Sequence, residues 1–216
     1  MFIGHPAVGF ASKPGAPRTS LGWLIAAPFF ADLLWPILLL LGIEHVRITP
    51  GSTAMTPFDF YDYPWSHSLL MLTIWGALLG GAYWLRTRYT RGAVLIFAGV
   101  VSHWVLDWLT HRADMPLWPG GPKVGLGLWN HVAATVIVEG ALFAIGVASY
   151  IRTTRAIDRI GSIGMGVFIA FLLFVYIGNL TGPPPPNVTA VAWVTLSLWL
   201  LPFWAAWFDR HREVRV

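Results

Sequence analysis

The stretch GSIGMGVFIAFLLFVYIGNL, residues 161–180, is an apolar run without a single charged side chain. A helix needs about 20 mostly apolar residues to cross the hydrocarbon core of a bilayer, so this run predicts a membrane-spanning helix. A second run of this kind, VTAVAWVTLSLWLLPFWAAWF, occupies residues 188–208. The prolines of TGPPPPN, between the two runs, favour a stiff and extended connection. Together the two runs predict a helical hairpin embedded in a membrane.

The composition of the whole chain also indicates a membrane protein. Of the 216 residues, 56% are hydrophobic and 11% are charged, whereas charged residues make up about 25% of an ordinary soluble domain. The net charge of +4 does not indicate a nucleic-acid partner, because the basic residues lie in short clusters between apolar runs. The absence of cysteine excludes disulfides, thiolate metal sites and cysteine nucleophiles. We therefore expect the lipid bilayer as the partner of this chain, and no nucleic acid.

Several segments are long and apolar enough to span a bilayer. We expect an all-α membrane protein, in which residues 1–216 form one integral domain built as a bundle of about six transmembrane helices. The expected helices cover residues 21–43, 66–86, 92–111, 128–151, 160–180 and 188–208.

The distribution of lysine and arginine predicts the orientation of the bundle. All but three of the 14 basic residues fall before the first expected helix, in alternate linkers or after the last helix. The three on the opposite side are Arg47, Arg112 and Lys123. Because basic residues concentrate on the cytoplasmic side, we expect a protein of the prokaryotic inner membrane with both termini in the cytoplasm.

The segment SHWVLDWLTH, residues 102–111, carries the clearest candidate site. His103, Asp107 and His111 recur at steps of four, which places them on one face of a helix. Ionisable residues inside a bilayer are costly and usually functional, although a polar seam that bonds helices together is the alternative. The three side chains span ~12 Å along the helix, so they need partners from other helices to bind one ion.

Such partners occur at matching depths on the other expected helices. Asp32 and Glu139 lie at the depth of His103, ~17–18 Å from the cytoplasmic helix ends. In contrast, His67, His111 and His131 fall near the outer ends. His5 precedes the first helix, and a short re-entrant N-terminal segment would bring it beneath this cluster.

Four short elements carry a resemblance to a known family. They are GHPAVGF at 4–10, FADLLWP at 30–36, WSHSLL at 65–70 and SHWVLDWLTHRADMPLWP at 102–119. Their order and spacing, over roughly residues 1–140, resemble the inner-membrane metal-dependent hydrolases described as LexA-binding. The HxxxD element is more distantly similar to the zinc-dependent phospholipase C and P1 nuclease group. The resemblance implies a metal site made of His5, Asp32, His67, His103 and Asp107.

The chain also departs from that family at two of these elements. Asp32 is followed by Leu33, Leu34 and Trp35, where the family often has a second aspartate. His67 follows the stretch DFYDYPWS, where an arginine-rich lead-in is common in the family. These departures bear on the substrate and on the number of metal ions.

Imidazole nitrogens and carboxylate oxygens suit a divalent metal, zinc above all and manganese as a second choice. The candidates exceed the needs of one tetrahedral ion, so the pattern fits one or two ions. As a base, Glu139 or an aspartate could accept a proton, or Glu139 could orient a ligand imidazole. The candidate catalytic residues are Asp107 and Glu139, and the candidate metal ligands are His5, Asp32, His67, His103, Asp107 and His111.

These residues favour a membrane-embedded metal-dependent hydrolase. A metal-activated water would attack a phosphoester or lipid-like substrate near the outer face. The main alternative is a proton-coupled or ion-coupled transporter, since intramembrane aspartate, glutamate and histidine also form proton relays. A haem protein with His67 and His103 as axial ligands is a third hypothesis, but the expected depths of these residues differ by ~12 Å.

Overall fold

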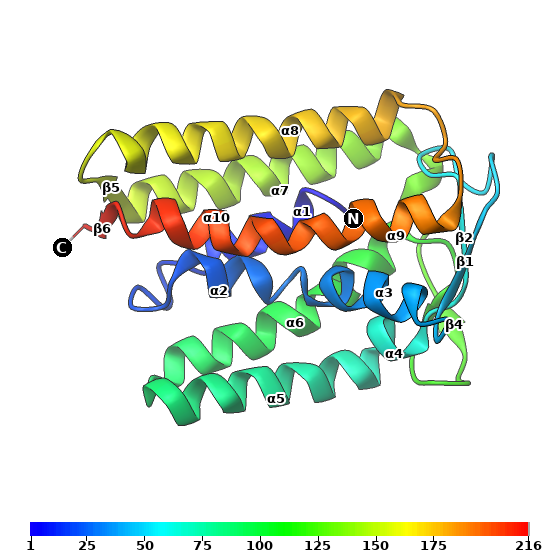
Figure 1. Ribbon diagram of the computed structural model, residues 1–216, viewed down its shortest axis with the longest axis horizontal. Helices are drawn as coiled ribbons and strands as arrows, with labels where there is room; N and C mark the ends of the chain where they lie inside the picture. The colour runs from blue at the N-terminus through cyan, green and yellow to red at the C-terminus, as the bar shows by residue number, and fades with distance from the viewer. Residues whose placement is uncertain (216) are drawn as a thin grey trace.

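Long apolar helices lie side by side in the computed structural model, which describes residues 1–215 (Figure 1). Within this range, five helical segments are long and apolar enough to cross a membrane. They are α5 (Leu69–Thr87), α6 (Thr90–Thr110), α7 (Val132–Thr153), η2 (Ile160–Gly164) continued by α8 (Met165–Thr181), and the run of α9 (Val188–Leu196), η3 (Ser197–Trp199) and α10 (Leu200–Asp209). The protein is therefore an all-α membrane protein, as expected.

The helix expected at residues 21–43 is broken, so the prediction of one spanning helix there is wrong. The segment forms two shorter helices, α2 (Leu21–Ala26) and α3 (Phe30–Leu40). Pro28 lies between them, and a proline has no N–H to donate to the carbonyl four residues before it. The chain therefore bends at residues 27–29.

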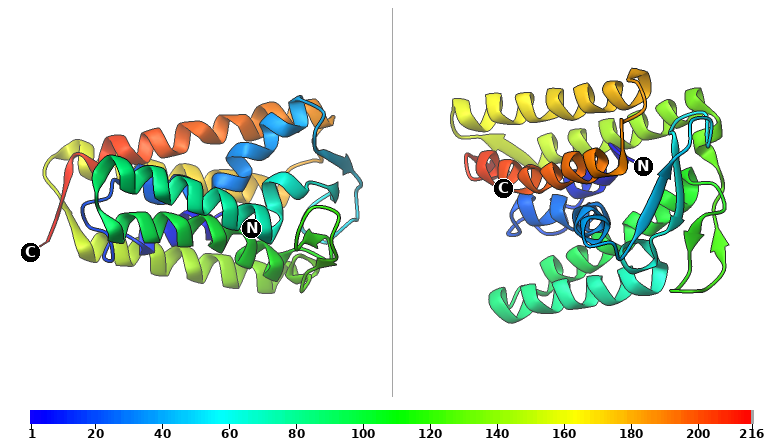
Figure 2. Two further views of the ribbon diagram at one scale, coloured as in Figure 1. Left: turned by 90° about the horizontal axis from the view of Figure 1, so that it is seen from below. Right: turned by 45° about the vertical axis from the view of Figure 1, so that its right-hand side comes forward.

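The N-terminal part of the chain fills the centre of the bundle. Helices α1 (Gly4–Ala11), α2 and α3 lie between the α5–α6 pair on one side and α7 to α10 on the other (Figures 1 and 2). Helix α1 is buried against α7, where Gly146 leaves room for the Ala7 carbonyl that any larger side chain would strike. The N-terminal segment thus enters the bundle without crossing it, as the re-entrant interpretation requires.

Short strands mark the two ends of the bundle. At one end, here called the hairpin end, β1 (His45–Ile48) pairs antiparallel with β2 (Phe58–Asp62), and β3 (Met115–Pro116) pairs with β4 (Lys123–Val124). The single-turn helix α4 (Pro64–His67) and the turn η1 (Leu128–Asn130) lie there too. At the other end, the C-terminal end, β5 (Thr154–Ala156) pairs with β6 (Arg212–Val214) (Figure 1).

Local capping decides where two of the long helices begin. The Ser68 hydroxyl, and not that of Ser66, accepts from the Met71 N–H and starts α5. His67 consequently belongs to α4 and not to the spanning helix. The Asn187 side chain accepts from the Ala190 N–H and starts α9 directly after Pro183–Pro186, which cannot continue a helix.

A buried ion pair ties the N-terminal segment to the C-terminal end. Lys13 Nζ lies 2.8 Å from Asp209 Oδ2, and both side chains are buried. Asp209 also accepts from the Leu21 N–H and from the Tyr150 hydroxyl. The carboxylate thus joins the α1–α2 linker, α7 and α10 at one point.

Candidate functional site

Side chains from four helices meet in the interior, near the hairpin end. We call this the histidine–aspartate cluster; its members are His5 of α1, Asp32 of α3, His67 of α4, and His103 and Asp107 of α6. The Asp107 carboxylate lies at its centre, 3.2 Å from His5 Nε2 and 3.1 Å from His103 Nε2. The His5 and His103 rings stack with their centroids 4.0 Å apart. The broken first helix, the re-entrant helix and α6 therefore converge on one site.

The cluster divides into two overlapping groups of potential ligands. One group contains His5, His103 and Asp107, and the other contains Asp32, His67 and His103. In each group the three ligand atoms lie within 4.8 Å of one another. His103 belongs to both, so the donor set offers room for one ion or for two neighbouring ones.

Several buried polar atoms in the cluster have no hydrogen-bond partner among the described residues. They include His5 Nδ1, and also His5 Nε2 and His103 Nε2, which lie 3.2 and 3.1 Å from Asp107 without the geometry of a hydrogen bond. A buried polar atom without a partner costs free energy, and each such atom in a folded protein needs an explanation. Imidazole nitrogens and carboxylate oxygens facing one another are the donors that zinc takes. The residues present therefore fit a divalent metal.

The break between α2 and α3 fixes the orientation of His103. The Pro28 carbonyl, which the break leaves outside the helical ladder, lies 2.8 Å from His103 Nδ1 and accepts a hydrogen bond from it. In the neutral ring this bond holds the proton on Nδ1 and aims Nε2 into the cluster, the arrangement found in metal-ligating histidines. Gly99, one turn earlier on α6, allows the close approach, because a Cβ there would lie 2.9 Å from Ala27 Cβ.

A buried glutamate that sequence analysis did not single out orients His67. The Ser66 hydroxyl lies 2.5 Å from Glu44 Oε2 and 2.6 Å from His67 Nδ1. The other carboxylate oxygen of Glu44 accepts from the Trp65 and Ser66 N–H groups. Burial raises the pKa of Glu44 and lowers the pKa of His67 to about 4. His67 is thus neutral at pH 7, the form that binds a metal, and its Nε2 lies 3.7 Å from Asp32 Oδ1.

His111 lies beside the cluster and has its own carboxylate partner. Its Nε2 is 3.5 Å from Asp107 Oδ2, and its Nδ1 is 3.0 Å from Asp114 Oδ1. Burial opposes a charge on this ring, but Asp107 and Asp114 raise the pKa of His111 above its usual value. His111 is not a member of either group of three, so the structure places it next to the cluster and not inside it.

Glu139 is buried near the N-terminal segment. Its Oε2 accepts from the Phe2 N–H at 2.9 Å, and its Oε1 has no partner among the described residues. Glu139 is also outside both groups of three potential ligands, but it lines the cavity described below. This position suits a group that acts on a molecule in the cavity.

One depth prediction differs from the structure. The expected separation of ~12 Å between His67 and His103 is wrong, because α4 folds inward and brings the ring centroids within 5.0 Å. His131 lies at the start of α7, the helix end where it was expected, and is exposed, whereas the cluster is buried.

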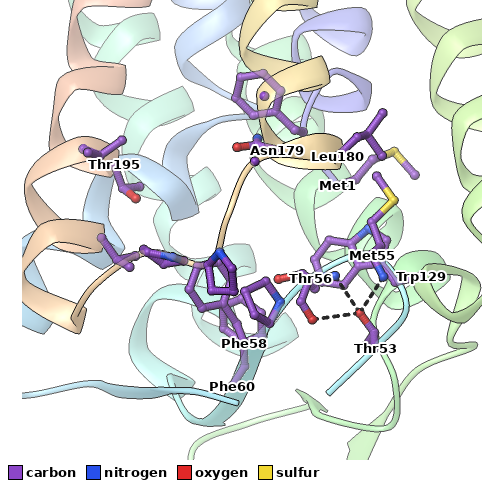
Figure 3. A pocket seen from close by; sticks show the side chains of 18 of the residues that line it. Met1, Thr53, Met55, Thr56, Phe58, Phe60, Trp129, Asn179, Leu180 and Thr195 are labelled. Carbon is purple, nitrogen blue, oxygen red and sulfur yellow. Dashed lines mark hydrogen bonds between the residues drawn. The ribbon is translucent and has the colours of Figure 1, made fainter. Parts of the chain in front are cut away.

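A cavity of about 620 Å³ opens above the cluster. Asp32, His67, Asp107, His111 and Glu139 lie on its wall, and the Asp32 side chain is the most exposed of the cluster, at 22%. Figure 3 shows Asn179 and Leu180 of α8 and Thr195 of α9 around the cavity, together with Phe58, Phe60 and Trp129. The cluster is therefore accessible to a molecule of ligand size.

Comparison with known families identifies the chain. The model of the YdjM inner membrane protein family matches residues 64–182, more than half of the protein. The chain belongs to this family. It is thus an integral protein of the inner membrane. Comparisons with curated proteins and with solved structures gave no match.

The YdjM family match covers only part of the cluster. It includes His67, His103 and Asp107, together with His111 and Glu139. His5 and Asp32 lie before residue 64, on the helices that fill the centre of the bundle. The matched region therefore carries one wall of the cluster, and the N-terminal helices complete it.

Proposed function

We propose that this protein is a membrane-embedded metal-dependent hydrolase that cleaves a phosphoester or a related bond. The observation that carries the proposal is the pair of ligand groups at the wall of a cavity, with imidazole nitrogens that make no hydrogen bond. A bilayer-embedded chain has no structural need for five ionisable side chains at one point, and such clusters are usually functional.

In this proposal the cluster holds one or two divalent ions, with zinc preferred and manganese second. When bound, the metal would activate a water molecule and neutralise charge on the phosphoryl oxygens. His5, Asp32, His67, His103 and Asp107 would hold it, and Pro28 and Ser66 would keep two of the imidazoles in the ligating orientation. The unpartnered Glu139 Oε1 would accept the proton of the attacking water.

We also propose the orientation that the basic residues favour. The arginines of the α5–α6 linker, of the α7–α8 linker and of the C-terminal tail lie at the C-terminal end of the bundle. With this end in the cytoplasm, the cavity faces the outer half of the membrane.

Metal analysis of the purified full-length protein tests the proposal. We expect zinc or manganese at one or two ions per chain, and its loss in Asp107→Ala. Asp62→Asn is the control, because Asp62 is an exposed carboxylate on β2 that pairs with His45. Folded protein that hydrolyses para-nitrophenyl phosphate without bound metal would contradict the proposal. Proton flux into liposomes that Asp32→Asn abolishes would support the transporter alternative instead.

A further inference from the structure

The cavity extends from the cluster to the lipid-facing surface between α8 and α9. Its lining on this side is mostly apolar: Val175, Tyr176 and Leu180 from α8, and Ala190, Val191, Val194 and Leu198 from α9 and η3. Val191 is 7% exposed and Val194 is 71% exposed. One turn of α9 therefore leads from the interior of the cavity to the surface that the bilayer covers.

The packing of the two helices explains why this side is open. Near the C-terminal end, α8 packs on α10 through Phe168 and Trp204, whose ring centroids are 5.3 Å apart. Toward the hairpin end, α9 packs on α3, and Trp199 Nε1 of η3 donates to the Leu33 carbonyl. The extended Pro183–Pro186 linker separates the ends of α8 and α9, and their ribbons diverge toward that end (Figure 1).

Among the described residues, no lysine or arginine lines the cavity to attract a small anion from water. Asp32, Asp107 and Glu139 are on the wall, and the N-terminal ammonium of Met1, which also lines the cavity, is already paired with Asp107. Sites that capture soluble phosphate compounds usually surround their entrance with cationic side chains that attract the anion. A molecule that reaches the site through the membrane does not need this attraction, because its hydrocarbon part keeps it beside the opening.

We infer that the substrate is a membrane lipid with a phosphoester headgroup, which enters sideways between α8 and α9. The inference rests on the proposed function. The headgroup would lie at the histidine–aspartate cluster, and one hydrocarbon chain would lie along Val175, Val191 and Val194. Hydrocarbon gains little free energy on moving from the bilayer to an apolar channel, so the channel positions the scissile bond and adds little affinity.

Photolabelling tests where the chain lies. The full-length protein is placed in nanodiscs of phosphatidylglycerol that contain a phosphatidylglycerol with a diazirine near the middle of one acyl chain. We expect label on Val191, which a chain can reach only from inside the cavity, and loss of most of this label in Val175→Trp. Leu173→Trp is the matched control, because Leu173 is on the same helix but does not line the cavity. Label confined to the outward residues Leu173, Phe174 and Ile177 would overturn the inference.

A kinetic comparison separates this inference from the proposed hydrolase activity. We expect Val175→Trp to slow hydrolysis of the long-chain lipid about 10–100-fold, because displacing a reacting group by about 1 Å has this effect. Hydrolysis of para-nitrophenyl phosphate and the metal content should not change. Equal loss for both substrates, or for neither, would overturn the lipid inference and leave the hydrolase proposal standing. Lipid label on Val191 in a metal-free, inactive protein would contradict the hydrolase proposal and leave lipid entry between α8 and α9 standing.

Discussion

His103 Nδ1 donates a hydrogen bond to the carbonyl oxygen of Pro28, 75 residues earlier in the chain, across 2.8 Å. In an unbroken helix this carbonyl would bond to the N–H four residues later. The break at Pro28 therefore removes a spanning helix and supplies the acceptor that orients the central histidine of the cluster.

Gly99 permits the contact between His103 and Pro28, so a larger residue at this position should weaken metal binding. A side chain at residue 99 would meet Ala27 and Pro28 and push α6 away from the break. We expect Gly99→Leu to lower zinc affinity about 10–100-fold, as the loss of a partner that orients a metal ligand does. Gly140→Leu is the control, since open space surrounds Gly140 on α7. Competition with a fluorescent zinc chelator gives both affinities, and equal values would contradict the prediction.

The Ser66 hydroxyl should orient His67 as the Pro28 carbonyl orients His103. Ser66→Ala removes the hydroxyl between Glu44 and His67 Nδ1, so the ring loses the group that fixes its orientation. We expect zinc affinity about 10–100-fold lower in this variant. Ser102→Ala, which removes a hydroxyl bonded only to the Gly99 carbonyl of its own helix, should bind zinc normally. A Ser66→Ala protein with the wild-type affinity would show that the hydroxyl has no such role.

Glu44 should make stability depend on pH. Because burial raises its pKa in the folded protein, the folded state holds the proton more tightly than the unfolded state. The free energy of unfolding should therefore fall as pH rises from the unfolded pKa through the folded pKa. Thermal unfolding in detergent between pH 4 and 7 should show a smaller fall for Glu44→Gln than for the wild type. Parallel pH profiles for the two proteins would rule out this contribution.

His5 should act as a ligand although it precedes the region matched by the family model. We expect His5→Ala to reduce zinc affinity by more than the ~10–100-fold expected for orienting residues, because it removes a donor atom. His131→Ala, which alters an exposed histidine at the start of α7, should leave metal content unchanged. Isothermal titration with zinc compares the two variants. Equal affinities would place His5 outside the site.

The Lys13–Asp209 ion pair should stabilise the protein more than the Arg155–Glu213 pair, which is also near the C-terminal end. Lys13→Met leaves a buried carboxylate without its cation, which typically destabilises a protein by about 3–5 kcal/mol. Arg155→Met breaks the exposed pair with Glu213, where about 0–1 kcal/mol is usual. Unfolding by titration with sodium dodecyl sulfate measures both, and a loss under about 1 kcal/mol for Lys13→Met would contradict the prediction.

The amino-acid sequence determined the membrane class, most of the spanning helices and one wall of the cluster. The hydrophobic runs at 161–180 and 188–208 are enough to assign the membrane class. In lipid, backbone groups must form their hydrogen bonds within each segment, so such runs fold as helices. The steps of four at His103 and Asp107 follow from helical geometry alone. Local pattern also singled out Asp32 and His67, because charged or imidazole side chains are rare in apolar segments.

The tertiary structure decided which of these residues meet and what orients them. Helix α4 turns inward and brings His67 to His103, which a count of residues along a continuous helix could not predict. Glu44 belongs to the site only because the turn between α3 and β1 lies against α4. Contacts between residues far apart in the chain depend on how helices pack, and packing leaves no periodic signal in one sequence. The opening between α8 and α9 likewise exists only where two helices diverge.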